Sequence, residues 1–202
     1  MTDFVLHHTP TSPYARMVRV LILEKGLEDR VEILAAKTRV AGSPYYAINP
    51  SGRVPYLVRK SDGTGFEDSS LILDVLDGFG GPRRFGFSDG EVGLAERRLE
   101  AQARSLIDGL AVWAREQRRP EDERSPGIIA HEQERARRMA SYFEEVVAGP
   151  CFSGDFNRVQ LTLVTALGME GRFGFEWREG RPGLAAFADP LLDSPSLAAT
   201  RP

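Results

Sequence analysis

Two serine-containing segments and the loop between them hold the residues whose types and spacing could do chemistry. Ser12 stands directly before a proline, and Ser69 follows Asp68 ahead of an apolar run. Each pattern is typical of a helix start, where free backbone N–H groups and the helix dipole favour an anion. A hydroxyl placed there can also donate a hydrogen bond to a thiolate or a carboxylate. The loop at residues 49–55 adds a cation, Arg53.

Each of these residues also has a purely structural explanation. Ser12 could be an ordinary helix cap, which contributes about 1 kcal/mol to stability. Asp68 and Ser69 could likewise do no more than begin a helix, and Arg53 could be an exposed residue at a strand edge. The residue types alone favour the structural explanation for Ser12 and for the Asp68–Ser69 pair. Whether these residues have a functional role therefore depends on the strands and helices that surround them.

The first 80 residues predict a small α/β domain with the element order βαβ-ββα. Strands are expected at residues 4–7, 31–35 and 54–58 and near Phe66, and helices over 16–25 and from Asp68 onward. A strand, a helix of about a dozen residues and a second strand form a βαβ unit, which implies a parallel pair. A loop over residues 42–52 and a hairpin turn at Ser61-Asp62-Gly63 connect the remaining pieces.

The rest of the chain predicts an all-helical domain. Residues 81–91, which begin with Gly81 and Pro82, are expected to be a linker, and residues 92–202 the second domain. Apolar residues in this second domain recur at spacings of three and four, as on one face of a long helix. They are Leu99, Ala103, Leu106, Leu110 and Trp113. A second helix is expected around residues 129–146, a buried one at 161–169 and a short one at 184–192. The fold class is therefore α/β plus all-α.

Composition excludes several classes of protein. The 202 residues have a formal net charge of −3, and their arginine-rich stretches are followed at once by acidic residues, so a nucleic-acid partner is not expected. The apolar runs are too short to cross a membrane, and the first residues do not resemble a signal peptide. A single cysteine, Cys151, favours a reducing compartment, and we expect a cytoplasmic protein. No cysteine or histidine spacing predicts a metal site.

Four segments give the chain a resemblance to the glutathione transferase family. They are Thr11-Ser12-Pro13-Tyr14-Ala15-Arg16, Asn49-Pro50-Ser51-Gly52-Arg53-Val54-Pro55, Glu67-Asp68-Ser69-Ser70-Leu71-Ile72, and Ala166-Leu167-Gly168 together with Trp177 and Pro195-Ser196. The first is similar to the serine-type active-site segment of many bacterial members. The second and third segments lie about a dozen residues apart and follow a βαβ unit in the chain. Either one alone is a weak indication of the family, but the two together are specific for it. The resemblance implies a thioredoxin-like first domain and a helical-bundle second domain.

The resemblance also implies how glutathione would be bound. Ser69 would bind the γ-glutamyl carboxylate and Asp68 the γ-glutamyl ammonium. The backbone of Val54 would pair with the cysteinyl unit like an added strand, with Pro55 in the cis form. Arg53 occupies a position where a basic residue often meets the glycyl carboxylate.

The catalytic residue implied by the resemblance is Ser12. Its hydroxyl and the helix N-terminus would stabilise the glutathione thiolate, although Thr11 is a close competitor for that contact. The pocket for the electrophile would be shaped by Thr11, Tyr14, Trp113 and Arg115. The alternative roles are packing for Tyr14 and Trp113 and an exposed surface position for Arg115.

The function implied is conjugation of glutathione to a small electrophile, as in detoxification, by a homodimer that needs no metal. Two alternatives remain open: a non-catalytic glutathione- or ligand-binding protein of the same fold, and a glutathione-dependent reductase or thiol transferase. A thiol transferase usually has a cysteine where Ser12 stands. The chain also departs from the family at residues 157–160, where Asn157 and Gln160 replace the usual Ser or Thr followed by Asp. Asn157 can still cap the helix.

Overall fold

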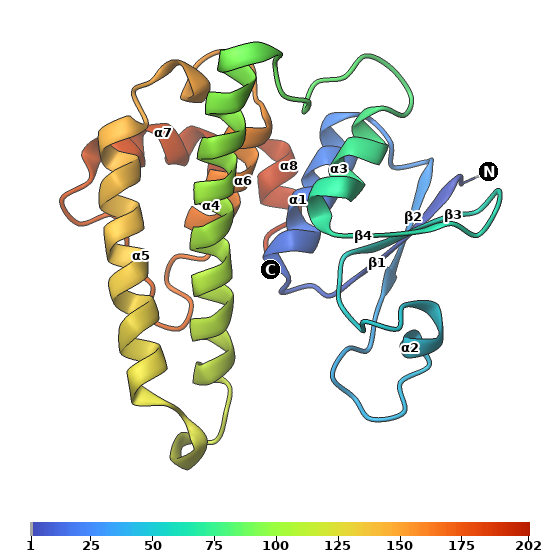
Figure 1. Ribbon diagram of the computed structural model, residues 1–202, viewed down its shortest axis with the longest axis horizontal. Helices are drawn as coiled ribbons and strands as arrows, with labels where there is room; N and C mark the ends of the chain where they lie inside the picture. The colour runs from blue at the N-terminus through green and yellow to red at the C-terminus, as the bar shows by residue number, and fades with distance from the viewer. Residues whose placement is uncertain (1) are drawn as a thin grey trace. The chain divides into compact units, whose positions relative to one another are not determined.

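The computed structural model describes residues 2–202, which divide into two compact units. One unit comprises the chain up to Gly86 together with Pro195–Pro202, and the other comprises Phe87–Ser194. The elements of both units are labelled in Figure 1. The division differs from the expected one at the C-terminus, because the last eight residues pack in the first unit.

The first unit is built on a four-stranded mixed sheet in the order β2-β1-β3-β4. The strands are β1 (Phe4–His8), β2 (Val31–Ala35), β3 (Tyr56–Arg59) and β4 (Gly65–Glu67). β1 runs parallel to β2, as the βαβ pattern predicted, and antiparallel to β3. β3 begins at Tyr56 and not at residue 54, because Pro55 has no N–H to donate to the sheet.

Helices cover both faces of this sheet. α1 (Pro13–Glu24) and α3 (Ser69–Asp77) lie side by side, as Figure 1 shows. Phe4 packs against Phe79, just after α3, whereas His7 contacts Tyr45 of α2 (Tyr45–Ile48). Residues an odd number of positions apart on a strand point to opposite faces, so α2 covers the face opposite α3. The expected loop over residues 42–52 therefore contains a short helix.

Arg16 binds the end of the chain to the first unit. Its side chain is buried, and its Nη2 donates to the carbonyl of Leu197 in α8 (Pro195–Ala199) at 3.0 Å. Its Nε donates to the hydroxyl of Thr200 at 3.4 Å. These bonds satisfy acceptors at the end of a helix too short to be stable alone. The prediction that residues 195–202 belong to the helical domain was therefore wrong.

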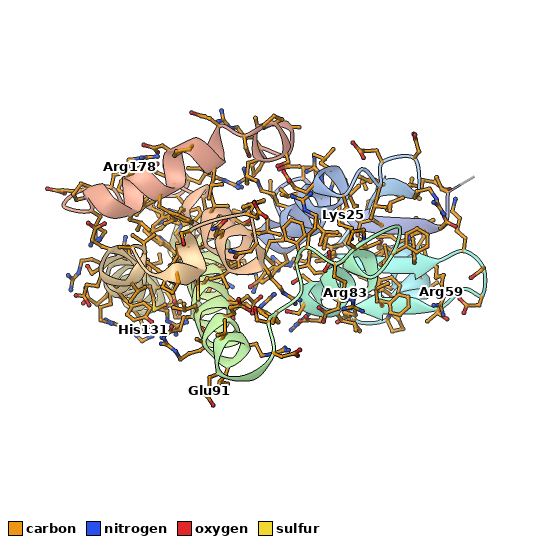
Figure 2. The ribbon with its side chains drawn as sticks, turned by 90° about the horizontal axis from the view of Figure 1, so that it is seen from above. Lys25, Arg59, Arg83, Glu91, His131 and Arg178 are labelled. Atoms are coloured by element: carbon orange, nitrogen blue, oxygen red, sulfur yellow. The ribbon has the colours of Figure 1, made fainter. Side chains whose placement is uncertain are left out.

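A buried ion pair fixes the segment that leaves the first unit. Lys25, labelled in Figure 2, donates to the backbone carbonyls of Asp77 at 2.6 Å and of Pro82 at 2.8 Å. Its ammonium lies 3.3 Å from the Asp77 carboxylate, which in turn accepts from the backbone N–H groups of Arg84 and Phe85. Phe85 is fully buried. The first part of the expected linker is thus held by specific contacts.

The second unit is all-helical in the residues described. Its α-helices are α4 (Gly90–Gln117), α5 (Pro126–Val146), α6 (Arg158–Leu167) and α7 (Pro182–Leu192). Every apolar residue predicted for one face of α4 is buried, and every residue of α6 is buried, as its composition predicted. Asn157 caps α6 by accepting from the N–H groups of Val159 and Gln160. The departure from the family pattern therefore leaves the cap in place.

Gly93 allows the chain before α4 to lie against the helix. A Cβ atom on Gly93 would lie 1.7 Å from the carbonyl oxygen of Ser88, whose own N–H donates to Glu96 at 2.7 Å. We expect Gly93→Ala to lower the free energy of unfolding by about 1–2 kcal/mol, because backbone must move to admit the methyl group.

The matched control for this prediction is Gly127→Ala in the first turn of α5. Apart from its chain neighbours and the backbone of its own helix, a Cβ atom there would meet no atom of residues 2–202 within 4 Å. That change should leave stability unchanged or raise it by up to about 1 kcal/mol, since alanine is the better helix former. Urea denaturation of both variants would decide, and equal effects would contradict the steric explanation.

No helix within residues 2–202 is both long enough and apolar enough to cross a membrane.

Candidate functional site

The register of the sheet brings the three predicted segments of the site to one end of it. Tyr56, the first residue of β3, pairs with His7 near the end of β1 and with Glu67 at the end of β4. The chain that follows β1 leads to Ser12, the chain before β3 contains Val54 and Pro55, and β4 leads directly into Asp68. All three segments therefore leave the sheet at the same edge, where α1 and α3 both begin.

Ser12 is the N-cap of α1. Its Oγ accepts a hydrogen bond from the N–H of Ala15 at 3.2 Å, and its own N–H donates to Thr9 at 3.1 Å. The side chain is half-buried. The hydroxyl proton has no acceptor among residues 2–202, so it is available to a ligand while the oxygen caps the helix. Thr11 is exposed and its hydroxyl is also unpaired within these residues.

The peptide bond between Val54 and Pro55 is cis, which confirms the form implied by the resemblance. Val54 is half-buried, yet its N–H and C=O have no hydrogen-bond partner in the described part of the chain. Most backbone groups away from open solvent are paired. A free donor and acceptor on one residue can therefore receive a short peptide as an added strand.

A network around Asn49 fixes the backbone ahead of Val54. The buried Asn49 amide donates to the carbonyl of Arg53 at 3.1 Å and to the carboxylate of Glu67 at 2.8 Å. The Tyr45 hydroxyl also donates to the Arg53 carbonyl. Ser51 completes the network, because its N–H donates to Asn49 Oδ1 and its hydroxyl to Glu67. The loop is thereby tied to both α2 and β4.

Asp68 holds an unusual backbone conformation at the start of α3. Its φ of 75° lies in the left-handed region, which few residues other than glycine, asparagine and aspartate adopt readily. Its carboxylate caps the helix by accepting from the N–H of Ser70 at 2.7 Å. The second carboxylate oxygen has no partner in residues 2–202, and the side chain is exposed. Asp68 can therefore cap α3 and bind a cation at once.

Charges of both signs meet at this end of the sheet. The N-termini of α1 and α3 and the exposed Arg53 guanidinium, which has no partner in the described chain, favour anions. Asp68 favours a cation. Ser69 is 3% exposed at the first position of α3. Such an arrangement suits an extended peptide that carries two carboxylates and one ammonium.

We expect Asn49→Ala to lower the free energy of unfolding by about 1–2 kcal/mol, because it leaves the Arg53 carbonyl and the Glu67 carboxylate with fewer donors. Ser51→Ala, at an exposed position, should cost less than about half as much. Thermal denaturation of both variants checks this prediction. Equal losses would contradict the central position of Asn49 in the network.

Two of the residues predicted to shape an electrophile pocket lie in the second unit. Trp113 is 3% exposed and packs against Phe173 and Phe175, with ring centroids 5.0 and 6.3 Å apart. Arg115 is exposed near the end of α4. The burial of Trp113 gives it a packing role within its unit. A role for either residue toward a substrate stays a prediction, as it does for the half-buried Tyr14 in the first unit.

Four residues of the network around Asn49 have no individual role predicted from the sequence: Tyr45, Asn49, Ser51 and Glu67. One local signal was available: an Asn two residues before Ser51 is typical of a side chain that accepts from the backbone and forms a turn. The contact between Asn49 and Glu67 joins residues 18 positions apart, and no local pattern predicts it.

Comparisons with known proteins agree with this geometry. Residues 11–78 match the family described as glutathione S-transferase, N-terminal domain. The uncharacterized GST-like protein YibF of Escherichia coli (strain K12) is 28% identical over 195 residues, which cover 95% of each chain.

Solved structures extend the likeness to the whole chain. A glutathione transferase family member from Pseudomonas fluorescens Pf-5, with bound glutathione, is 28% identical, covers 99% of both chains and has a TM-score of 0.87. A glutathione S-transferase from Methylobacillus flagellatus KT, also with glutathione bound, is 26% identical with the same TM-score and covers 99% of this chain and 100% of its own.

The first unit thus has the thioredoxin-like fold, and it is joined to an all-helical second unit. Residues 11–78 match the glutathione S-transferase N-terminal domain, and the whole chain is similar in sequence and fold to solved glutathione transferases.

Proposed function

We propose that this protein is a glutathione transferase that joins the thiol of glutathione to a small electrophile. The observation that carries the proposal is the meeting, at one end of the sheet, of an unpaired Ser12 hydroxyl, the unpaired backbone of Val54 and the capped N-terminus of α3. The relatives solved with glutathione bound support the same ligand.

In this proposal each end of glutathione has its own partner. The γ-glutamyl carboxylate binds at the N-terminus of α3 beside Ser69, and the γ-glutamyl ammonium binds the free oxygen of Asp68. The N–H and C=O of Val54 pair with the cysteinyl unit. Arg53 binds the glycyl carboxylate. These contacts place the cysteinyl thiol toward the start of α1.

The chemical step then needs a thiolate. A free cysteine thiol has a pKa of about 8.5, so little of it is ionised at neutral pH. The Ser12 hydroxyl and the N-terminus of α1 stabilise the anion and lower that pKa. The thiolate attacks an electrophilic carbon and forms a carbon–sulfur bond. A leaving group then departs with its bonding electrons or, in an activated alkene, the π electrons move to the neighbouring carbon, which takes a proton from solvent. The thiol proton goes to solvent.

Calorimetric titration with glutathione, followed by assays against a panel of aryl halides, epoxides and activated alkenes, tests the proposal. We expect saturable binding of glutathione and turnover of at least one electrophile class. Binding without any turnover would favour the alternative, a glutathione-binding protein of the same fold. Absence of binding would contradict the assignment of Val54, Asp68 and Ser69.

We also propose that the protein works as a homodimer. Large apolar side chains are exposed in both units, and they include Leu71 on α3 and Val92 and Leu94 at the start of α4, with exposed fractions of 47%, 61% and 60%. Exposed apolar side chains are typical of an interface where they gather in one patch, and we propose that Val92 and Leu94 are part of it.

We expect the double variant Val92→Lys, Leu94→Lys to be monomeric, because two buried charges would destabilise the interface. The wild type should be a dimer at the same concentration. Light scattering coupled to size-exclusion chromatography measures both masses. A wild-type monomer, or a variant that remains dimeric, would contradict this interface.

A further inference from the structure

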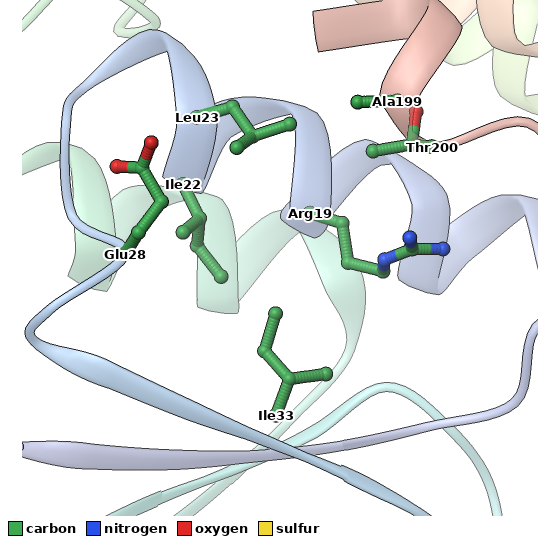
Figure 3. Close-up of a pocket in the computed structure, with 7 residues that line it drawn as sticks. All are labelled: Arg19, Ile22, Leu23, Glu28, Ile33, Ala199 and Thr200. Atoms are coloured by element: carbon green, nitrogen blue, oxygen red, sulfur yellow. The ribbon is translucent and has the colours of Figure 1, made fainter.

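A small cavity lies in the first unit, lined by none of the residues assigned to glutathione. It has a volume of about 180 Å³ and is lined by α1, β2, the loop between them and the end of the chain. The lining residues, drawn in Figure 3, are Arg19, Ile22, Leu23, Glu28, Ile33, Ala199 and Thr200. A cavity of about 150 Å³ lined by apolar side chains is large enough to hold benzene. This one therefore has room for a body of about six carbons.

The walls of the cavity are largely apolar. Ile22 and Leu23 of α1 lie across from Ile33 of β2, as Figure 3 shows. Ile33 pairs with Leu6 in the sheet and therefore points to the α1 face, yet it remains 41% exposed. The Thr200 hydroxyl is already engaged with Arg16 and the carbonyl of Ser196. The cavity thus offers apolar surface that the protein itself leaves uncovered.

Arg19 is the one cation among the lining residues. Its side chain is half-buried, and within residues 2–202 its guanidinium has no hydrogen bond and no ion pair. Burial lowers the pKa of this guanidinium below its usual range. The pKa of His8 is likewise lowered, first by burial and then by the charge of Arg19. The positive charge of Arg19 therefore acts on His8, and no acidic group among the described residues pairs with it.

An unpaired charge taken out of water is costly, and most such groups in proteins have a partner. A guanidinium binds carboxylates with paired, charge-assisted hydrogen bonds. We propose that this cavity binds a small monocarboxylate with an apolar body of about six carbons, whose carboxylate pairs with Arg19.

Glu28 sets a limit on the ligand. In Figure 3 it lies at the other end of the cavity from Arg19, with Ile22 and Ile33 between them. A dicarboxylate of the same length would bring its second anion toward Glu28, where like charges repel. The site is therefore selective for one carboxylate over two, and it rejects an amine at the Arg19 end.

The test is a nuclear magnetic resonance titration of the full-length, isotope-labelled protein with hexanoate in saturating glutathione. We expect saturable shifts at the side chain of Arg19 and the backbone amides of Ile33, Ala199 and Thr200. Adipate and hexylamine should bind at least about tenfold more weakly, since adipate brings a second anion toward Glu28 and hexylamine places a cation beside Arg19. Saturating glutathione keeps the outcome independent of the proposed transferase function.

Arg19→Gln removes the partner of the carboxylate, and Arg39→Gln is the matched control. Arg39 also has no partner among residues 2–202, but it is exposed. Arg19→Gln should weaken hexanoate binding at least about tenfold and should raise the melting temperature, because it removes an unpaired, half-buried charge. Arg39→Gln should change neither. Shifts that do not saturate, or that persist in Arg19→Gln, would overturn the proposal.

Discussion

Replacing Ser12 with alanine should lower turnover about 100-fold while changing glutathione affinity little. The variant lacks a hydrogen-bond donor to the negative charge on the reacting sulfur. Removing such a donor typically lowers kcat by about 100- to 1000-fold. Because the hydroxyl proton has no acceptor in the described chain, the effect should fall on the chemical step. Steady-state kinetics with glutathione as the varied substrate measures it.

The cap formed by Ser12 makes a second variant necessary. Alanine also removes the acceptor for the N–H of Ala15 and should cost about 1 kcal/mol of stability, whereas glycine should cost only a few tenths of that amount. Ser12→Gly should therefore lose as much turnover as Ser12→Ala and remain more stable. Thr11→Val tests the competing hydroxyl. If Thr11→Val had the larger effect on turnover, Thr11 and not Ser12 would contact the thiol.

Asp68→Asn should weaken glutathione binding by about 10- to 100-fold. A hydrogen bond to a charged group contributes about 1.5–3 kcal/mol, and about 1.4 kcal/mol corresponds to a tenfold change in Kd. Asparagine can keep the hydrogen bond to the N–H of Ser70 and tolerates the φ of 75°. The fold should therefore be unaffected, and calorimetric titration should show the loss in affinity alone.

Asp68→Ala separates the two roles of this residue. It removes the cap as well as the charge, and alanine tolerates a positive φ poorly, so we expect an additional loss of about 1–2 kcal/mol of stability. Glutathione affinity should fall as much as in Asp68→Asn. An Asp68→Asn variant with wild-type affinity would show that this carboxylate only caps α3.

Local signals explain which parts of the site the sequence predicted. The pairs Ser12–Pro13 and Asp68–Ser69 are helix starts recognisable within a few residues, and both were confirmed as helix starts. The apolar residues that recur at spacings of four and three along α4 likewise predicted which face of this helix is buried. These features depend on neighbours in the sequence, so composition and spacing are enough to find them.

The features that were missed depend on contacts distant in sequence. α8 returns to the first unit because Arg16 binds Leu197, 181 positions away, and no short segment contains that information. The support of Val54 by Asn49 and Glu67 is of the same kind. The start of β3 was placed two residues early because the apolar pattern of residues 54–58 outweighed the missing N–H of Pro55.

The measurement that tests the central claim most directly is the thiol pKa of glutathione bound to the wild-type protein. It is followed by the ultraviolet absorbance of the thiolate as a function of pH, with Ser12→Ala alongside. We predict that the wild type lowers this pKa by about one unit or more, which corresponds to about 1.4 kcal/mol, and that the variant restores most of it. An unchanged thiol pKa in a saturated wild-type complex would contradict thiol activation by Ser12.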